Sequence, residues 1–132
     1  MLFKGKYYFL SNYYPCTIMY NGLSFTCVES AFHAQKNLSM SRFFVGMTAA
    51  ESKKLGRQVE LRPDWEYIKN SVMYELLRIK FSDPELMTQL KQVQGEIVED
   101  NYWGDTYWGV FKGQGTNVLG KLLMKIRDDE IN

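Results

Sequence analysis

The dipeptide Asn21-Gly22 is the feature of this 132-residue sequence that most constrains its fold. It separates two short runs of apolar and β-branched residues, 17–20 and 23–26. Asn and Gly readily adopt the positive φ values of a two-residue type I′ turn, so the pattern predicts a β-hairpin. This hairpin would deliver the chain directly into a helix that begins near Thr26.

The predicted helix over 26–38 has two different faces. One is a largely apolar stripe, formed at about 100° per residue by Val28, Ala31, Gln35 and Leu38. Glu29, His33 and Lys36 fall together on the other side, at spacings of four and three. This group is either an active surface or a solvated face with ordinary side-chain pairs. Thr26 and Glu29 also fit a capping box, and spacing alone favours the solvated face.

Start and stop signals predict further helices. Thr48 and Glu51 form a second capping box, and Gly56 is the expected C-terminal cap of that short helix. The longest helix is expected from about Trp65 to Phe81. Its predicted apolar stripe is Trp65, Ile68, Val72, Leu76 and Ile79, with Lys69, Met73 and Lys80 at the edge.

The second half of the chain adds two helices and an aromatic loop. Residues 82–84 start a helix that ends at Gly95, and Thr116 or Asn117 caps the last helix. The segment 57–62 is expected to be a short strand or an extended connection, 96–100 a short strand, and 101–109 a surface loop. The whole predicts one α+β domain over 1–132, mostly helical, with a small N-terminal hairpin.

Composition limits the possible functions. A formal net charge of +1 predicts no broad attraction to nucleic acid or anionic membrane, so a nucleic-acid partner would be gripped locally. No apolar run is long enough to span a bilayer. With one His and two Cys in no ligand spacing, we expect neither a metal nor a cofactor. Cys16 and Cys27 are expected to be reduced thiols in a cytoplasmic protein.

Several separated blocks together resemble a known family. They are 9–15, 28–36, 55–57, 61–65, 72–73, 80–81, 97–99, 105–109, 115–124 and 126–127. In this order they resemble the NADAR domain family, which includes YbiA-like N-glycosidases. The insert 102–104 departs from the family pattern, as does 93–95, where a Thr-Gly pair is expected.

The resemblance implies cleavage of the bond between ribose C1′ and a nitrogen leaving group. Two substrate classes remain open: phosphorylated ribosylamino-pyrimidine intermediates of riboflavin synthesis, and ADP-ribose attached to nucleobases, chiefly guanine in nucleic acid. The alternative is a non-catalytic module that binds ADP-ribose or a related nucleotide, and a small interaction protein is a weaker third possibility. A monomer and a homodimer are equally compatible with the sequence.

Catalytic candidates follow from this reaction, which builds positive charge on the sugar and negative charge on the base. Carboxylates serve such reactions as acids, bases or cation stabilisers. Glu29 is the first candidate and Asp105 the second, whereas Glu99 would orient a neighbour. Lys36 either binds a ribose hydroxyl or phosphate, or attacks C1′ to form an imine, which requires a lowered pKa. A surface amine paired with Glu29 is the structural alternative.

Binding candidates come from the same blocks. Arg57 and Arg62 suit phosphate oxygens, although ion pairs with Asp64 or Glu60 are as plausible. Trp65 and Trp108 fit the two sides of a planar base, unless Trp65 belongs to the core. The other candidates are Phe9, Ser11, Asn12, Gln35, Lys80, Gly109 and Asn117. Of these, Asn117 is either a helix cap or a phosphate seat, and Gly109 more simply permits close backbone approach. His33 is expected to be a satisfied surface residue.

Overall fold

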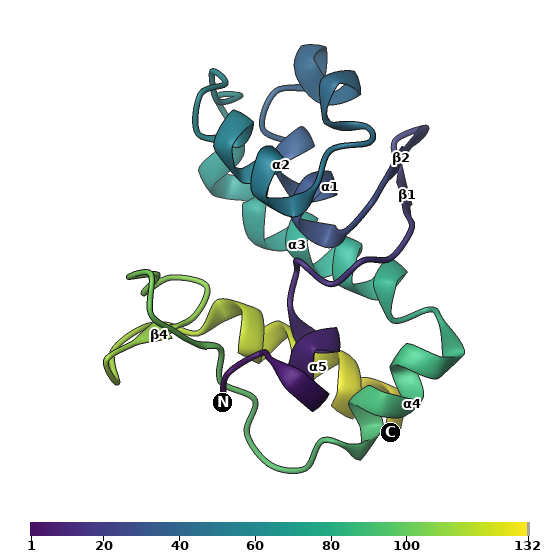
Figure 1. The fold of residues 1–132 in the computed structure, drawn as a ribbon, viewed down its shortest axis with the longest axis vertical. Helices are drawn as coiled ribbons and strands as arrows, with labels where there is room; N and C mark the ends of the chain where they lie inside the picture. The colour runs from purple at the N-terminus through teal and green to yellow at the C-terminus, as the bar shows by residue number, and fades with distance from the viewer. Residues whose placement is uncertain (132) are drawn as a thin grey trace. The chain divides into compact units, whose positions relative to one another are not determined.

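The computed structural model describes residues 1–131, with side chains through residue 129. The chain forms two compact units, the central unit Asn12–Lys80 and the terminal unit made of Met1–Ser11 with Phe81–Asn132. The fold is α+β and mostly helical, as the sequence predicts (Figure 1). Within residues 1–131, no helix is both long and apolar enough to cross a membrane.

The central unit begins with the predicted hairpin. Strand β1 (Ile18–Tyr20) pairs antiparallel with β2 (Leu23–Phe25), so that Ile18 faces Phe25 across the ladder. Asn21 and Gly22 have φ values of 49° and 79°, which confirms the predicted turn. The hairpin therefore delivers the chain to the first helix as expected.

Helix α1 spans Val28–Ala34, and its start differs from the prediction. Cys27 is the N-cap and its Sγ accepts from the Ser30 amide at 3.5 Å, whereas the Thr26 hydroxyl donates to the Met47 carbonyl at 2.6 Å. The predicted capping box of Thr26 and Glu29 is therefore wrong, because the Thr26 hydroxyl bonds a distant segment. The apolar stripe is also shorter than predicted, since Leu38 is exposed at the start of the 3₁₀ helix η2 (Leu38–Phe44).

Helix α2 spans Ala49–Gly56, and the predicted capping box of Thr48 and Glu51 is confirmed at its start. Its end differs from the prediction. Arg57 is the C-cap, with a right-handed φ of −79°, and Gly56 is instead the last helical residue. Residues 57–62 form no strand but a turn followed by extended chain, in which the Arg62 amide donates to the Lys36 carbonyl at 2.8 Å.

Helix α3 spans Trp65–Lys80, in agreement with the predicted longest helix. Its buried face is Trp65, Val72, Met73, Leu76, Leu77 and Lys80, so Met73 and Lys80 lie inside rather than at the edge.

Helix α1 contacts α2, α3, η2 and both strands, and it is the centre of this unit (Figure 1). The short helix is therefore fixed mainly by packing, since seven residues form no stable helix alone.

The terminal unit contains a 3₁₀ helix and two α-helices. They are η1 (Gly5–Leu10), α4 (Pro84–Gln92), which Asp83 caps, and α5 (Val118–Ile131). Helix α4 contacts α5, and it ends before the predicted Gly95. The predicted strand over 96–100 is largely wrong: β3 is only Asp100–Asn101, and it pairs in parallel with β4 (Val110–Phe111).

The segment 97–99 is instead held against the start of α5. Asn117 Nδ2 donates to the Ile97 carbonyl at 3.0 Å, and Asn117 Oδ1 accepts from the Glu99 amide at 3.0 Å. A Cβ atom on Gly120 would lie 2.5 Å from Asn117 Oδ1 and closer still to the Ile97 oxygen. The missing side chain of Gly120 therefore permits the backbone of 97–99 to dock on α5, as the sequence suggests.

We expect Gly120→Ala to destabilise the protein by about 1–3 kcal/mol, because the added methyl group overpacks this contact. The loss would appear although Ala is the better helix former by about 1 kcal/mol. Urea denaturation measures the difference. Lys121→Ala, at the next and exposed position of the same helix, is the matched control and should change stability by less than about 0.5 kcal/mol. Equal stability of the two variants would contradict the close contact.

Candidate functional site

Glu29 and His33 share one face of α1, as predicted, whereas Lys36 lies just beyond the C-cap Gln35, so it is not on the helix as predicted. The face that carries Glu29 and His33 is not solvated. The His33 Nε2 and Glu29 Oε1 atoms are 2.8 Å apart, and the two side chains are only 8% and 13% exposed. The prediction of a surface histidine is wrong, because α2 covers the ring at Gly56. A Cβ atom on Gly56 would lie 2.6 Å from Cγ of His33.

Lys36 follows the C-cap of α1, and the pKa of its amine is perturbed. Its Nζ atom donates to the Gly56 carbonyl at 3.4 Å. Burial lowers the pKa of the Lys36 amine, while the nearby Glu29 carboxylate opposes this fall and the Arg57 guanidinium adds to it. The amine therefore loses its proton more readily than an ordinary lysine, and it lies within electrostatic range of both Glu29 and Arg57.

Tyr13 joins this group, although the sequence did not single it out. Burial raises the pKa of the Tyr13 phenol, Glu29 raises it further, and Arg57 lowers it. Its position inside the block 9–15, next to Asn12, was the available signal. Asn12 itself is buried, and its carbonyl accepts from the Glu29 amide at 3.0 Å. Asn12 thus anchors the start of α1 beneath the carboxylate.

The two candidate arginines differ. Arg62 forms a fork with Asp64, with Nε–Oδ1 and Nη2–Oδ2 distances of 2.6 and 3.1 Å, so the ion-pair alternative holds for this residue. That guanidinium holds the pKa of Asp64 below its usual range. Arg57 is exposed beside Lys36 and Tyr13. Arg57 is therefore the better placed of the two to meet a phosphate group.

Two other candidates of the central unit, Trp65 and Gln35, are buried in its core. Trp65 is buried, and its ring centroid lies 5.0 Å from that of Phe32, which favours the core interpretation over a base platform. Gln35 is also buried; it accepts from Asn21 Nδ2 at 2.9 Å and donates to the Ala31 carbonyl at 3.0 Å. These bonds tie α1 to the hairpin turn.

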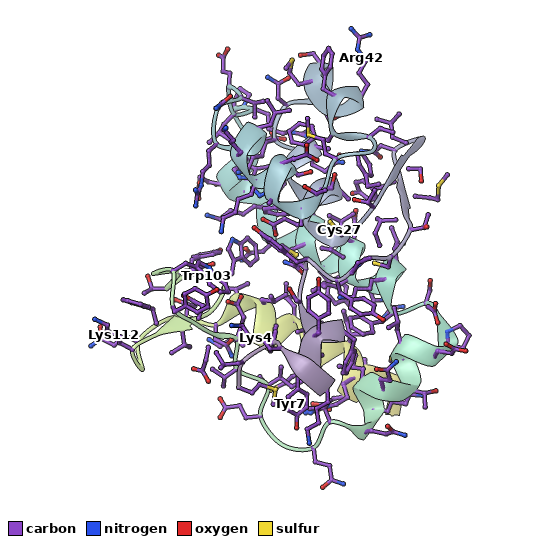
Figure 2. The ribbon with its side chains drawn as sticks, in the orientation of Figure 1. Lys4, Tyr7, Cys27, Arg42, Trp103 and Lys112 are labelled. Carbon is purple, nitrogen blue, oxygen red and sulfur yellow. The ribbon has the colours of Figure 1, made fainter. Side chains whose placement is uncertain are left out.

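Lys80 is the most deeply buried charged side chain of the central unit, at 2% exposure. Its Nζ lies 5.5 Å from the centroid of the Tyr14 ring. Burial lowers the pKa of the Lys80 amine to about 8, while Cys16 and Cys27 oppose this fall. Cys27 lies at the start of α1 (Figure 2), and burial raises the pKa of its thiol. The two cysteines form no disulfide.

The candidates Asp105, Trp108 and Gly109 belong to the loop between β3 and β4. Asp105 Oδ1 accepts from the amides of Tyr107 and Trp108, both at 2.9 Å, so this carboxylate shapes the loop. Trp108 is half-buried and packs edge-on against Tyr107. A Cβ atom on Gly109 would lie 2.7 Å from Glu99 Oε1, which confirms the close approach expected there.

The side chain of Asn117 contacts the backbone of Glu99. Glu99 is buried, and its amide is held by the Asn117 side chain as described above. Asn117 adopts a positive φ of 57° before α5, and its amide group binds 97–99, so the structure favours a bracing role over a phosphate seat. Glu99 and Asp105 thus belong to one braced region of the terminal unit.

Phe9 and Ser11 belong to the N-terminal segment of this unit, at the end of η1. Phe9 is buried and packs edge-on against Phe81, with ring centroids 6.5 Å apart. It also borders a groove of about 550 Å³ that is lined by Lys6, Tyr7, Phe9, Gln89, Gln92, Val93 and Gln94. Ser11 is partly exposed, and its amide donates to the Tyr8 carbonyl at 2.9 Å as η1 ends.

The unusual insert 102–104 presents two exposed aromatic rings. Tyr102 and Trp103 are 69% and 52% exposed, and their centroids are 5.1 Å apart at a steep angle. Lys4 Nζ lies 5.0 Å from the centroid of Tyr102. The parallel register places Tyr102 and Lys112 directly after the paired ends of β3 and β4. Lys4, Trp103 and Lys112 all belong to the terminal unit (Figure 2).

Metal ligation finds no support in the part of the chain whose side chains are described. Among residues 1–129, no three His, Cys, Asp or Glu side chains lie close enough to hold an ion. The chemistry available in the central unit is therefore that of a carboxylate, an imidazole, an amine, a phenol and a guanidinium group, contributed by Glu29, His33, Lys36, Tyr13 and Arg57.

Comparison with known proteins identifies the family. The sequence-family model for the NADAR domain matches residues 2–130. The chain belongs to the NADAR domain family. The resemblance inferred from the separated blocks is thereby confirmed. The solution structure of YbiA from Escherichia coli superposes with a TM-score of 0.85 at 30% identity, and covers 99% of this chain and 84% of that one.

Curated relatives of this NADAR domain carry two kinds of name. The E. coli N-glycosidase YbiA is 33% identical over 126 residues, which are 89% of this chain and 78% of that protein. A riboflavin biosynthesis protein of Vibrio vulnificus is 30% identical over 128 residues. The chloroplastic riboflavin biosynthesis protein PYRR from Arabidopsis thaliana is 39% identical over 71 residues. The matches span 92% and 52% of this chain, but only 35% and 12% of the two riboflavin proteins.

The buried amine of Lys80 should make the stability of this NADAR domain depend on pH. Because the pKa of Lys80 is lowered to about 8 in the folded state, the unfolded chain binds more protons between pH 8 and 10. The Lys80 contribution to stability therefore rises over this range, by about 1.4 kcal/mol per unit of pKa difference. The stability of Lys80→Met relative to the wild type should fall by this amount between pH 7 and 10. Parallel urea-derived stability profiles for the two proteins would contradict it.

Proposed function

We propose that this chain is an N-glycosidase that hydrolyses the bond between ribose C1′ and a nitrogen leaving group. The observation that carries the proposal is a shielded carboxylate, Glu29 on α1, within electrostatic range of the perturbed amine of Lys36, which follows the end of that helix. The name of the E. coli relative, N-glycosidase YbiA, supports the same reaction class. Glycosidase activity in general thus has support from both the family and the residues.

Glu29 is the group we assign to the reacting bond. As the C1′–N bond breaks, positive charge grows on the sugar, and a carboxylate beside it stabilises that charge or activates the attacking water. The departing nitrogen takes up a proton as the water oxygen bonds to C1′. Because the Glu29 side chain is only 13% exposed, its charge acts in a less screened environment than a surface carboxylate.

Lys36 is assigned the covalent role in a two-step version of this reaction. The unprotonated amine attacks C1′ and displaces the base, which leaves with a proton. The sugar ring then opens to an imine on Nζ, and water hydrolyses the imine to release the ribose aldehyde and restore the amine. Burial supports this role because it lowers the pKa of the Lys36 amine and so raises the unprotonated fraction.

Phosphorylated ribosylamino-pyrimidines of riboflavin synthesis are the substrate class that we favour. Relatives from Vibrio vulnificus, Arabidopsis thaliana and Zea mays are named riboflavin biosynthesis proteins. Arg57 suits the phosphate, since it is exposed and lies within electrostatic range of Lys36. The Arg62 guanidinium already engages Asp64, so it is our second choice for this contact.

One observation favours ADP-ribose on a nucleobase of nucleic acid as the second candidate. Tyr102 and Trp103 are exposed rings beside Lys4, and exposed aromatics flanked by amines are typical of surfaces that stack bases and meet phosphates. Such a local grip is what a chain with a net charge of +1 requires. Release of guanine from ADP-ribosylated DNA, compared with release of pyrimidine from the ribosylamino phosphate, decides between the two.

We expect Glu29→Gln to lower kcat by about 10²–10⁴-fold with a small change in KM, because the amide keeps the shape but loses the charge. The measurement is release of free base from both substrate classes. Glu66→Gln, an exposed glutamate that pairs with Lys69 on α3, is the matched control and should keep full activity. If the wild type binds ADP-ribose in calorimetry and releases no base, the non-catalytic module becomes the correct interpretation.

We expect borohydride to trap a ribosyl adduct on Lys36 during turnover. The adduct should be absent from Lys36→Arg and unchanged in Lys54→Arg, which alters an exposed lysine of α2. Because the reacting form is the free amine and its pKa is lowered, trapping should increase with pH and reach half its maximum below pH 10.5, the usual lysine value. Peptide mass spectrometry locates the adduct. Turnover without any trapped Lys36 would exclude the covalent route and leave Lys36 as a binding group.

A further inference from the structure

His33 lies beside the proposed reacting groups, Glu29 and Lys36, but the proposed reaction gives it no role. It is the one histidine of the chain, and its side chain is 8% exposed. Its Nε2 atom lies 2.8 Å from Glu29 Oε1, one helical turn away. Among the described residues, the hydrogen-bond partner of the Glu29 carboxylate is the His33 ring. The imidazole is therefore the group that sets the orientation of that carboxylate.

The opposite side of the ring is fixed by backbone. Gly56 lies so close that a Cβ atom there would be 2.6 Å from His33 Cγ, 2.9 Å from its Cβ, and closer still to Nδ1. The ring of Phe32 adds an edge-on contact, with centroids 5.7 Å apart. The imidazole is thus clamped between Gly56 of α2 and the Glu29 carboxylate, and it has little room to rotate.

The clamp also determines where the imidazole proton resides. Nδ1 is buried and has no hydrogen-bond partner among the described residues. A proton on Nδ1 would bury a donor without an acceptor, whereas a proton on Nε2 is donated to Glu29. The neutral ring with Nε2–H satisfies the site best. Since that proton is committed to Glu29 and Nδ1 faces Gly56, neither ring nitrogen is offered to a substrate.

We propose that His33 is a positioning residue that acts through Glu29. It donates Nε2–H to Oε1, holds the carboxylate against α2, and so directs Oε2 to the reacting sugar. The same Gly56 receives the Lys36 amine at its carbonyl, so the clamp also sets the spacing between the carboxylate and the amine. This inference rests on the proposed function of Glu29.

Two substitutions at position 33 test the proposal. His33→Gln keeps an amide N–H near the place of Nε2–H and should retain at least half of kcat. His33→Leu has a similar bulk but no donor, and we expect a 10–100-fold loss in kcat with KM within about twofold. Ser52→Ala removes a buried hydroxyl from the contacting helix α2, outside the proposed site, and should leave kcat unchanged. Equal kcat values for the Leu variant and the wild type would overturn the proposal.

A double-substitution cycle separates this inference from the proposed function. If His33 acts through Glu29, adding His33→Leu to Glu29→Gln should cause no further loss of kcat. A further 10-fold loss in the double variant would assign His33 a role independent of Glu29 and overturn the inference alone. Full activity of Glu29→Gln by itself would instead overturn the proposed function together with the inference.

Nuclear magnetic resonance provides a readout that needs neither substrate nor activity. Because His33 is the only histidine, its ring nitrogen signals are unambiguous in the ¹⁵N-labelled wild-type protein. We expect the pattern of a single neutral tautomer with the proton on Nε2, and its loss in Glu29→Leu, which removes the acceptor. A ring protonated on Nδ1, or one that exchanges rapidly between tautomers, would contradict the clamp even if the Leu variant failed to fold.

Discussion

The close approach of α2 to α1 at Gly56 is the contact on which the proposed chemistry depends. Because Gly56 has no side chain, the His33 ring can lie against its backbone, and the Gly56 carbonyl is then within reach of Lys36. Without this approach, Glu29 and His33 would form an ordinary exposed pair on a helix surface, worth at most about 0.5 kcal/mol. Shielding by α2 converts a common spacing on a seven-residue helix into a fixed arrangement of functional groups.

The terminal unit also depends on close backbone contacts at glycine residues. Gly109 permits the loop to meet the Glu99 carbonyl, and Gly120 permits α5 to meet the Ile97 carbonyl. The side-chain amide of Asn117 bonds both ends of the segment 97–99, the Ile97 carbonyl and the Glu99 amide. All these residues, and Gly56, lie in the blocks by which the family resemblance was inferred. Those blocks therefore encode close backbone packing as much as chemistry. A resemblance carried by glycine and asparagine predicts the fold more securely than it predicts the residues that touch the substrate.

The features that the sequence predicts correctly are those with local causes. The hairpin turn depends on two adjacent residues, the capping box of α2 on four, and α3 on a periodic stripe, so each is visible within its own segment. The errors involve distant partners. Thr26 bonds the Met47 carbonyl instead of capping α1, and His33 is buried because Gly56 covers it. The predicted strand over 96–100 failed for the same reason, since Asn117 holds that segment from another element.

Burial alone does not identify a functional lysine in this protein. Lys80 is more buried than Lys36, yet its Nζ lies over the Tyr14 ring, and the charges that oppose the fall of its pKa are those of Cys16 and Cys27. Lys36 combines a lowered pKa with the proximity of Glu29, which raises it, and of Arg57, which lowers it again. The two charges of opposite sign thus offset each other in part, and desolvation decides the outcome. An amine that remains beside a carboxylate and still gives up its proton readily is what an attack on a ribose carbon requires.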